Sequence, residues 1–119
     1  MNILIVEDDY LIGQDLLDRL KTMGHDVLGP ASNCAAALEA LFNTRPDIAM
    51  VDTRLGSETC EAVLSECRAL DVPVIICSAH DAEGLPAYCA GLPRVGKPFE
   101  NDEIAGQVCG TLRDASSAA

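Results

Sequence analysis

The sequence predicts an α/β protein with a five-stranded parallel sheet of order 2-1-3-4-5 and helices on both faces. Two observations support this fold class. Short aliphatic runs alternate with amphipathic segments along the chain, and that alternation favours parallel strands joined by right-handed crossovers. Several of the runs are almost continuously apolar, as strands covered on both faces must be. The 119 residues suffice for one domain, and no internal repeat or linker divides them.

Five strands are expected, each where an aliphatic run occurs. They cover residues 2–6, 26–29, 47–51, 73–77 and 93–96. Three of the runs are nearly continuous in apolar residues, whereas "PRVG" at 93–96 is the weakest of the five.

Four amphipathic helices are expected from apolar residues at helical spacing. The four apolar stripes are Ile12, Leu16, Leu20 and Met23; Cys34, Ala37, Leu38, Leu41 and Phe42; Cys60, Val63, Leu64 and Cys67; and Ala105, Val108, Cys109 and Leu112. Three residues have the side chains that N-caps require, namely Asp9, Ser32 and Asn101.

Two segments depart from the alternating pattern. Residues 80–93 should hold a further helix, yet they include Gly84, Pro86, Gly91 and Pro93. Glycine and proline both oppose helix, so we expect a loop with at most a turn or two. The tail 114–119, "DASSAA", is expected to be disordered, which leaves one domain over residues 1–113.

Composition excludes several classes of protein. The net charge of −11 makes nucleic acid a poor partner, because its phosphates would be repelled. There is no signal-peptide pattern and no apolar run of membrane-spanning length, so we expect a soluble, cytoplasmic protein. The six cysteines show no metal-binding spacing and are expected to be reduced. Cys34, Cys60, Cys67, Cys109 and Cys77 are expected to face the core, and Cys89 has no predicted place.

Polar residues follow the expected strands at their carboxyl ends. Glu7, Asp8 and Asp9 come after the first strand and Asp52 after the third, while Ser78 follows the fourth and Lys97 the fifth. In an open parallel sheet, ligands bind beyond these ends. We therefore expect these side chains to meet at one edge of the sheet.

The charges at this edge imply a cation. Glu7, Asp8 and Asp52 contribute −3 and Lys97 contributes +1, which leaves −2. A divalent cation with oxygen ligands would balance it, and Mg²⁺ suits a site of few carboxylates. No histidine or thiolate occupies these positions, which argues against zinc. A carboxylate nucleophile, a metal, a lysine and a hydroxyl are the parts needed to accept a phosphoryl group.

Four segments resemble the signature segments of the response-regulator receiver domain of two-component signalling. They are "ILIVEDD", "DIAMVD", "VIICSA" and "GKPF", and the resemblance covers residues 2–112. It implies a flavodoxin-like, three-layer fold. The fourth strand is partly similar to a variant group of single-domain receivers with the pattern P-F-x-F-A-T-G-Y, although Ala79 and His80 replace the Gly and Tyr.

The resemblance implies a role for each residue of the metal site. Asp52 is the expected phosphoacceptor and a metal ligand. Asp8 would bind Mg²⁺ directly, Glu7 would bind it through water, and Arg54 would offer its backbone carbonyl. Asp9 would serve as the helix cap.

The resemblance also assigns the groups that hold the phosphoryl. Lys97 would pair with the phosphoryl oxygens and Ser78 would hydrogen-bond to one of them, with the Lys97–Pro98 peptide in the cis form. Arg94 is a departure, because receivers commonly carry Tyr or Phe at that position.

The implied function is that of a phosphoacceptor response regulator. A histidine kinase or histidine phosphotransfer protein would phosphorylate Asp52 with Mg²⁺, and the output would be protein–protein contact or phosphate shuttling. No enzyme activity is expected beyond phosphorylation and dephosphorylation of the protein itself. Whether the chain is a whole protein or a domain of a longer one stays open.

Three other functions compete with this one. A phosphohydrolase with a nucleophilic aspartate needs a second acid two residues on, where this chain has Arg54. A nucleotide or flavin binder of the same fold needs a Gly-rich loop after the first strand, and "EDDYLIGQD" has none. An interaction module that acts without phosphorylation ranks second.

Overall fold

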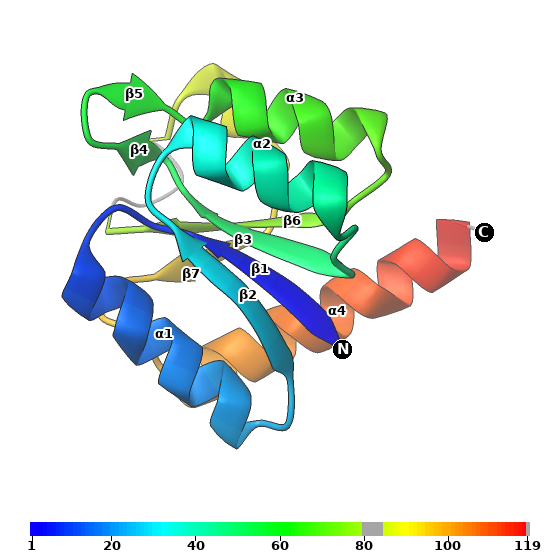
Figure 1. Ribbon diagram of the computed structural model, residues 1–119. Coiled ribbons are helices and arrows are strands. Elements are labelled where there is room, and N and C mark those ends of the chain that lie inside the picture. The colour runs from blue at the N-terminus through cyan, green and yellow to red at the C-terminus, as the bar shows by residue number, and fades with distance from the viewer. Residues whose placement is uncertain (80–84, 119) are drawn as a thin grey trace.

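The computed structural model describes residues 1–79 and 85–118 and confirms the predicted fold class. A five-stranded parallel sheet has the order β2-β1-β3-β6-β7 (Figure 1). With a small hairpin left out of the count, this is the predicted order 2-1-3-4-5. The strands are β1 (Asn2–Val6), β2 (Asp26–Ala31), β3 (Ile48–Asp52), β6 (Val74–Ser78) and β7 (Arg94–Gly96).

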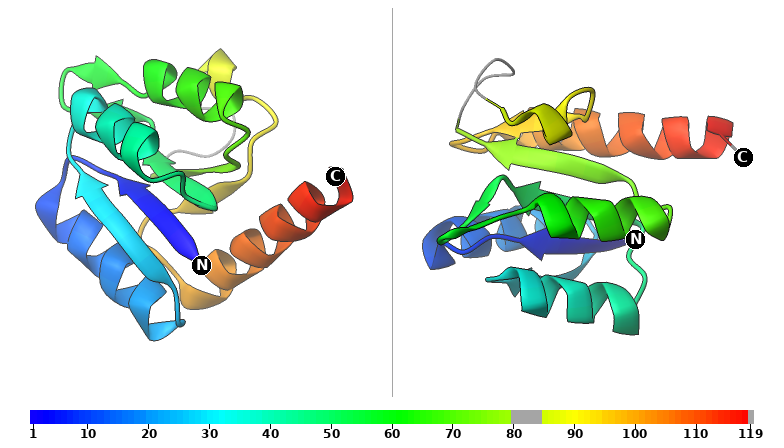
Figure 2. Two further views of the ribbon diagram at one scale, coloured as in Figure 1. Left: turned by 45° about the vertical axis from the view of Figure 1, so that its right-hand side comes forward. Right: turned by 90° about the horizontal axis from the view of Figure 1, so that it is seen from above.

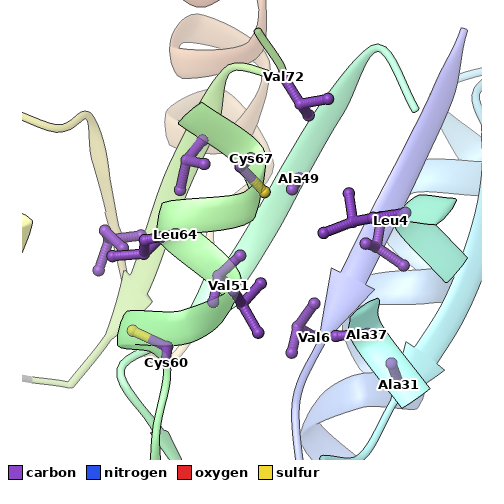
Figure 3. Packing of buried hydrophobic residues seen from close by; sticks show 14 of the residues in the cluster. Leu4, Val6, Ala31, Ala37, Ala49, Val51, Cys60, Leu64, Cys67 and Val72 are labelled. Carbon is purple, nitrogen blue, oxygen red and sulfur yellow. The ribbon is translucent and has the colours of Figure 1, made fainter. Parts of the chain in front are cut away.

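Four helices form the two outer layers, as Figures 1 and 2 show. Helices α1 (Tyr10–Thr22) and α4 (Asn101–Ala118) cover one face of the sheet, and α2 (Cys34–Asn43) and α3 (Glu61–Ala69) cover the other. Each face has its own cluster of buried aliphatic side chains. Figure 3 shows the cluster beneath α2 and α3.

Strand β1 shows why its sequence is apolar throughout. Leu4 and Val6 belong to the cluster under α2 and α3, whereas Ile3 and Ile5 belong to the cluster under α1 and α4. All four side chains are buried. Alternate residues of a strand point to opposite faces, so a strand covered on both faces must be apolar at every position.

The helix starts agree with the prediction at one of three positions. Asp9 caps α1, since its side chain accepts a hydrogen bond from the Ile12 amide at 3.1 Å. The cap of α2 is Asn33 and not Ser32, with the Asn33 side chain bonded to the Ala36 amide at 2.8 Å. Asn101 is the first residue of α4 and accepts a hydrogen bond from Arg19 on α1, so it does not serve as a cap.

Two of the apolar stripes were assigned wrongly at particular residues. Phe42 is 89% exposed at the end of α2, although Ala37 and Leu41 of the same stripe are buried. In the part of α4 whose side chains the structure describes, the buried residues are Ile104, Val108 and Thr111. The prediction was right for Val108, whereas Ala105 and Cys109 are exposed. Helical spacing alone does not reveal which face of a helix packs against the rest of the protein.

The cysteines follow these helix faces. Cys60, Cys67 and Cys77 are buried as expected, Cys34 is half-buried, and Cys109 is exposed on the outer face of α4, contrary to the prediction. Cys89, which had no predicted place, is buried against the cluster under α2 and α3.

The connection after β3 contains an element that the sequence analysis did not anticipate. Strands β4 (Arg54–Leu55) and β5 (Glu58–Thr59) form a small antiparallel hairpin beside the carboxyl ends of the main strands (Figure 1). Within the described part of 80–93, a single short 3₁₀ turn, η2 (Ala87–Cys89), interrupts an irregular segment, as predicted. The remaining part of that loop, residues 80–84, lies outside the described residues.

The end of the chain differs from the expected disordered tail. Helix α4 continues to Ala118. The sequence after Arg113 contains neither glycine nor proline to stop a helix, which accounts for the continuation. The domain boundary at residue 113 stays a prediction. Over the described ranges, no helix has both the length and the apolar character needed to cross a bilayer.

Candidate functional site

The carboxyl ends of the central strands bring the predicted side chains together. Asp52 is the last residue of β3, while Glu7 and Lys97 directly follow β1 and β7. Strands β1, β3, β6 and β7 are neighbours in this order, and they are parallel. Their carboxyl ends therefore share one edge of the sheet.

Lys97 bridges two carboxylates at this edge. Its Nζ lies 2.6 Å from Oε1 of Glu7 and 3.0 Å from Oδ2 of Asp52. The side chains of Lys97, Glu7 and Asp52 are only 14%, 4% and 13% exposed. Water screens such a cluster poorly, so its charges interact strongly. The Lys97–Pro98 peptide is cis, as the resemblance implies.

The two carboxylates have opposite pKa shifts. Burial and a hydrogen bond to Asp52 raise the pKa of Glu7 to about 8, even though Lys97 opposes the change. Burial also acts to raise the pKa of Asp52, but hydrogen bonds from Glu7 and Lys97 outweigh it and hold that pKa below its ordinary value. At neutral pH, Glu7 is mostly protonated and Asp52 is the ionised partner of Lys97.

Asp8 completes an acidic cluster with Glu7 and Asp52. One carboxylate oxygen from each lies within 4.8 Å of the others. Asp8 also accepts a hydrogen bond from the amide of Gly56, in the turn of the β4–β5 hairpin, at 2.8 Å. Three carboxylate oxygens at this spacing fit a hard cation such as Mg²⁺. Zinc is bound mainly by thiolate and imidazole ligands, and this cluster contains neither.

The third acid of the "EDD" run has a structural role. The carboxylate of Asp9 caps α1, and its own amide donates to Oε2 of Glu7 at 3.5 Å. The three consecutive acids thus have three different roles. Glu7 is a largely protonated member of the acidic cluster, Asp8 is a member that bonds the hairpin, and Asp9 caps α1.

Ser78 and Arg94 occupy the adjoining strand ends. Ser78 is buried, and the register places it opposite Gly96, one residue beyond the partner of Asp52. Its backbone carbonyl accepts hydrogen bonds from the Lys97 amide at 3.2 Å and from the Arg94 guanidinium at 3.4 Å. Arg94 thus contacts the backbone of the strand end that carries Ser78.

Arg54 contacts the site through its backbone. Its amide donates to Oδ1 of Asp52 at 3.3 Å, and this bond also favours the ionised form of Asp52. Its side chain is exposed. Sequence reasoning named Arg54 but missed Gly56. Nothing in the local sequence pairs Gly56 with Asp8, which lies 48 residues earlier.

A largely apolar hollow of about 460 Å³ lies beside the cluster. Leu11 and Ile12 of α1 form part of its lining, and Lys97, Pro98 and Phe99 form another part. Leu11 is well exposed. The hollow therefore gives the cluster an apolar approach from the side of α1.

The family model for the response regulator receiver domain matches residues 3–108. The chain is 30% identical over 125 aligned residues to the phyllosphere-induced regulator PhyR of Methylorubrum extorquens, covering 98% of this chain and 45% of PhyR. It is 33% identical over 110 residues to the positive alginate biosynthesis regulatory protein of Pseudomonas aeruginosa, covering 88% of this chain and 44% of that protein. The chain therefore spans less than half the length of these curated relatives.

Solved structures show the same similarity. The signal receiver domain of a modulated diguanylate cyclase from Desulfovibrio desulfuricans G20 superimposes with a TM-score of 0.86 at 28% identity, covering 99% of this chain and 98% of that chain. The BeF₃-activated conformation of SdrG from Pseudomonas melonis Fr1 gives a TM-score of 0.81 at 28% identity, with coverage of 93% and 95%.

Proposed function

Because this chain belongs to the response regulator receiver domain family of two-component systems, we propose that it accepts a phosphoryl group on Asp52. The observation that carries the proposal is that Asp52 pairs with Lys97 and also shares the acidic cluster with Glu7 and Asp8. Asp52 is held ionised by its neighbours, so the carboxylate oxygen keeps the lone pair that attack on phosphorus requires. The ammonium of Lys97 supplies a positive charge beside this carboxylate.

Receiver domains typically bind Mg²⁺ at such an acidic pocket, and we assign the metal here to Asp8, Asp52 and Glu7, with the Arg54 carbonyl as a further ligand. The clustering of three carboxylates supports this assignment. Bound Mg²⁺ would supply charge neutralisation for the phosphoryl oxygens. Glu7 would give up its proton as the metal binds, since a cation favours the ionised carboxylate.

The proposed donor is the phosphohistidine of a histidine kinase or a histidine phosphotransfer protein. An oxygen of Asp52 forms the new bond to phosphorus as the P–N bond breaks, and the histidine nitrogen keeps the electron pair. The apolar hollow beside Lys97 is suited to receive the donor's surface, because the exposed Leu11 would be covered there.

Two residues would then hold the transferred group. The Lys97 ammonium would move from the carboxylates toward the phosphoryl oxygens, and the Ser78 hydroxyl would bond to one of them. Movement of Ser78 would be transmitted to Arg94 through the Ser78 carbonyl that Arg94 contacts. The output would be a protein–protein contact or onward transfer of the phosphoryl group, and the protein would act on no other substrate.

A receiver-like interaction module without phosphorylation is the second candidate. The contact between Arg94 and the Ser78 backbone favours it, since a guanidinium bonded to this strand end could hold Ser78 in one position. In that case Lys97 and Asp52 would serve only as a structural ion pair.

Phosphoramidate provides a direct test of the proposed donor chemistry, because its P–N bond resembles that of phosphohistidine. The full chain is incubated with phosphoramidate and Mg²⁺, and the phosphorylated form is separated on a phosphate-affinity gel. The proposal expects a shifted band that is lost with a metal chelator and in Asp52→Asn. An unshifted band for the wild-type protein would favour the interaction module.

A further inference from the structure

The β4–β5 hairpin contacts two carboxylates of the site through its backbone. The amide of Arg54 donates to Oδ1 of Asp52 at 3.3 Å. The amide of Gly56 donates to Oδ2 of Asp8 at 2.8 Å. While Asp8 makes this bond, one of its oxygens lies within 4.8 Å of oxygens of Glu7 and Asp52. The hairpin therefore holds Asp8 in the position that suits a shared cation.

The second strand of the hairpin contacts the start of α2. Cys34 is the first residue of this helix, and its amide donates to Oε1 of Glu58 at 3.4 Å. The Cys34 thiol donates to the Thr59 carbonyl at 3.2 Å. Figure 1 shows the hairpin beside the end of the molecule at which α2 begins. One small element thus joins the acidic cluster to the N-terminal end of α2.

The hairpin is too small to be stable by itself. Its strands have two residues each, and the turn Gly56–Ser57 joins them. Gly56 has a φ of +65°, which favours glycine at the first position of such a turn. An isolated two-stranded hairpin is marginally stable in water, so the closed form depends on contacts with the rest of the protein. The buried side chain of Leu55 provides one contact, and the bonds at Asp8 and Cys34 provide others.

From these contacts we propose that the β4–β5 hairpin couples metal binding at the acidic cluster to the N-terminal end of α2. This coupling rests on the metal site proposed above for the same cluster. A cation that fixes Asp8 favours the closed hairpin, and the closed hairpin holds Asp8 in the ligating position. Coupling between two sites is reciprocal, so the bonds at Cys34 strengthen cation binding by the factor by which the cation strengthens those bonds. Helix α2 is thereby an element that responds to an occupied metal site.

The Cys34 thiol is a probe of the closed hairpin. Cysteine is alkylated as the thiolate, and burial together with the Glu58 carboxylate raises the pKa of Cys34. Opening of β5 breaks the bond to the Thr59 carbonyl and exposes the sulfur, so the alkylation rate follows the open fraction. A cation bound at the cluster should therefore slow the alkylation of Cys34.

Alkylation of the full chain with iodoacetamide, with and without Mg²⁺, tests the coupling. The protein carries Cys109→Ser to remove the exposed thiol, and peptide mapping follows Cys34 and the buried Cys67 separately. Mg²⁺ should slow the alkylation of Cys34 at least about fivefold, and less than about twofold when Asp8→Asn is also present. Cys67 records opening of the whole fold, so its rate gives the protection that comes from general stabilisation alone.

The reverse direction of the coupling has its own readout. Glu58→Ala removes the acceptor of the Cys34 amide, whereas Glu58→Gln removes the charge but keeps an oxygen for that bond. Calorimetric titration should show Mg²⁺ binding about threefold weaker in Glu58→Ala than in Glu58→Gln. Glu61→Ala, which removes another exposed acid, should bind Mg²⁺ like Glu58→Gln.

The results distinguish failure of the coupling from failure of the metal assignment, because calorimetry on the same samples records whether Mg²⁺ binds. Bound Mg²⁺ with an unchanged rate at Cys34, or with equal slowing at Cys34 and Cys67, would overturn the coupling and leave the metal site in place. Equal Mg²⁺ affinities of Glu58→Ala and Glu58→Gln would also overturn it. No binding of Mg²⁺ to the wild-type protein would overturn both the metal assignment and the coupling.

Discussion

The ammonium of Lys97 lies 3.0 Å from a carboxylate oxygen of Asp52, although 45 residues separate the two in the sequence. The same ammonium lies 2.6 Å from Glu7. A single cation therefore holds together the ends of β1, β3 and β7. The position of each side chain follows from the strand that precedes it, and the electrostatic properties of the site follow from their proximity and burial.

Replacing Lys97 with Met should destabilise the fold. The substitution leaves Asp52 beside Glu7 without its cation, and we expect a loss of about 2 kcal/mol in the free energy of unfolding, since breaking a buried ion pair is costly. Urea denaturation at neutral pH measures it. Lys21→Met, at an exposed position in α1, is the matched control and should change stability by no more than about 0.5 kcal/mol. Equal effects of the two substitutions would contradict this prediction.

The raised pKa of Glu7 should make stability depend on pH. Its ordinary value is 4.5 and its value in the folded protein is about 8, so the folded state holds this proton more tightly than the unfolded chain. The stabilisation from Glu7 is therefore complete at low pH, declines as pH rises between these two values, and is gone above the higher one. Denaturation curves recorded across this range without divalent ions should show the decline in the wild-type protein.

The comparison with Glu7→Gln isolates this effect. Burial lowers the pKa of His25, which contributes the opposite slope, but it does so equally in both proteins. The difference in stability between wild type and Glu7→Gln should therefore shift against the wild type as pH rises. Two curves that run parallel over the whole range would show that Glu7 titrates normally.

Substitutions at the neighbouring residues Asp8 and Asp9 should affect metal binding and helix capping separately. Asp8→Asn removes a charged metal ligand but keeps an oxygen for the Gly56 amide, so Mg²⁺ affinity should fall at least about tenfold with little change in stability. Asp9→Ala removes the cap of α1 and should cost about 1 kcal/mol while changing Mg²⁺ affinity by no more than about twofold. Calorimetric titration and urea denaturation measure the two quantities. The reverse pattern would exchange the roles assigned to Asp8 and Asp9.

Two adjacent residues of α2 should differ sharply in their effect on stability. Leu41 is buried, and Leu41→Ala should cost about 3 kcal/mol through lost burial and the cavity that remains. Phe42 is exposed, and Phe42→Ala should change stability by about 0.5 kcal/mol or less. A large loss on truncating Phe42 would mean that a partner or a second copy of the chain covers it.

The sheet could be predicted from the sequence because strands that are covered on both faces must be apolar at nearly every position. Val6 of β1 and Val51 of β3 are apolar because both faces of the sheet are covered. Glu7 directly follows β1, and Asp52 is the last residue of β3. The polar residues that meet at the site could be found for the same reason. In a parallel sheet, the direction of each strand determines the edge at which its last residues lie.

The helix faces were harder, because two stripes in one helix can have the same spacing. In α4, Val108 belongs both to the predicted stripe through Cys109 and to the buried stripe with Ile104 and Thr111, and the polar character of Thr111 favoured the wrong one. Thr111 is buried, and among the described residues its hydroxyl is the buried side-chain polar atom left without a hydrogen-bond partner. Helical periodicity records which residues share a face but not which face a neighbour covers.

Contacts made through loops could not be predicted at all. Asp8 bonds to the amide of Gly56 only because an irregular segment folds back on the sheet. A backbone amide gives no signal in the sequence. Arg94 belongs here too, since its bond to the Ser78 carbonyl depends on where β6 ends relative to β7.

Intact mass after incubation with a small acyl phosphate and Mg²⁺ tests the central claim most directly. The account predicts that the wild-type protein gains one phosphoryl group, that Asp52→Asn gains none, and that a metal chelator prevents the gain. Asp47→Asn, an acid outside the cluster, should be phosphorylated like the wild type. A wild-type mass that stays unchanged, or a phosphoryl group that remains in Asp52→Asn, would contradict the account.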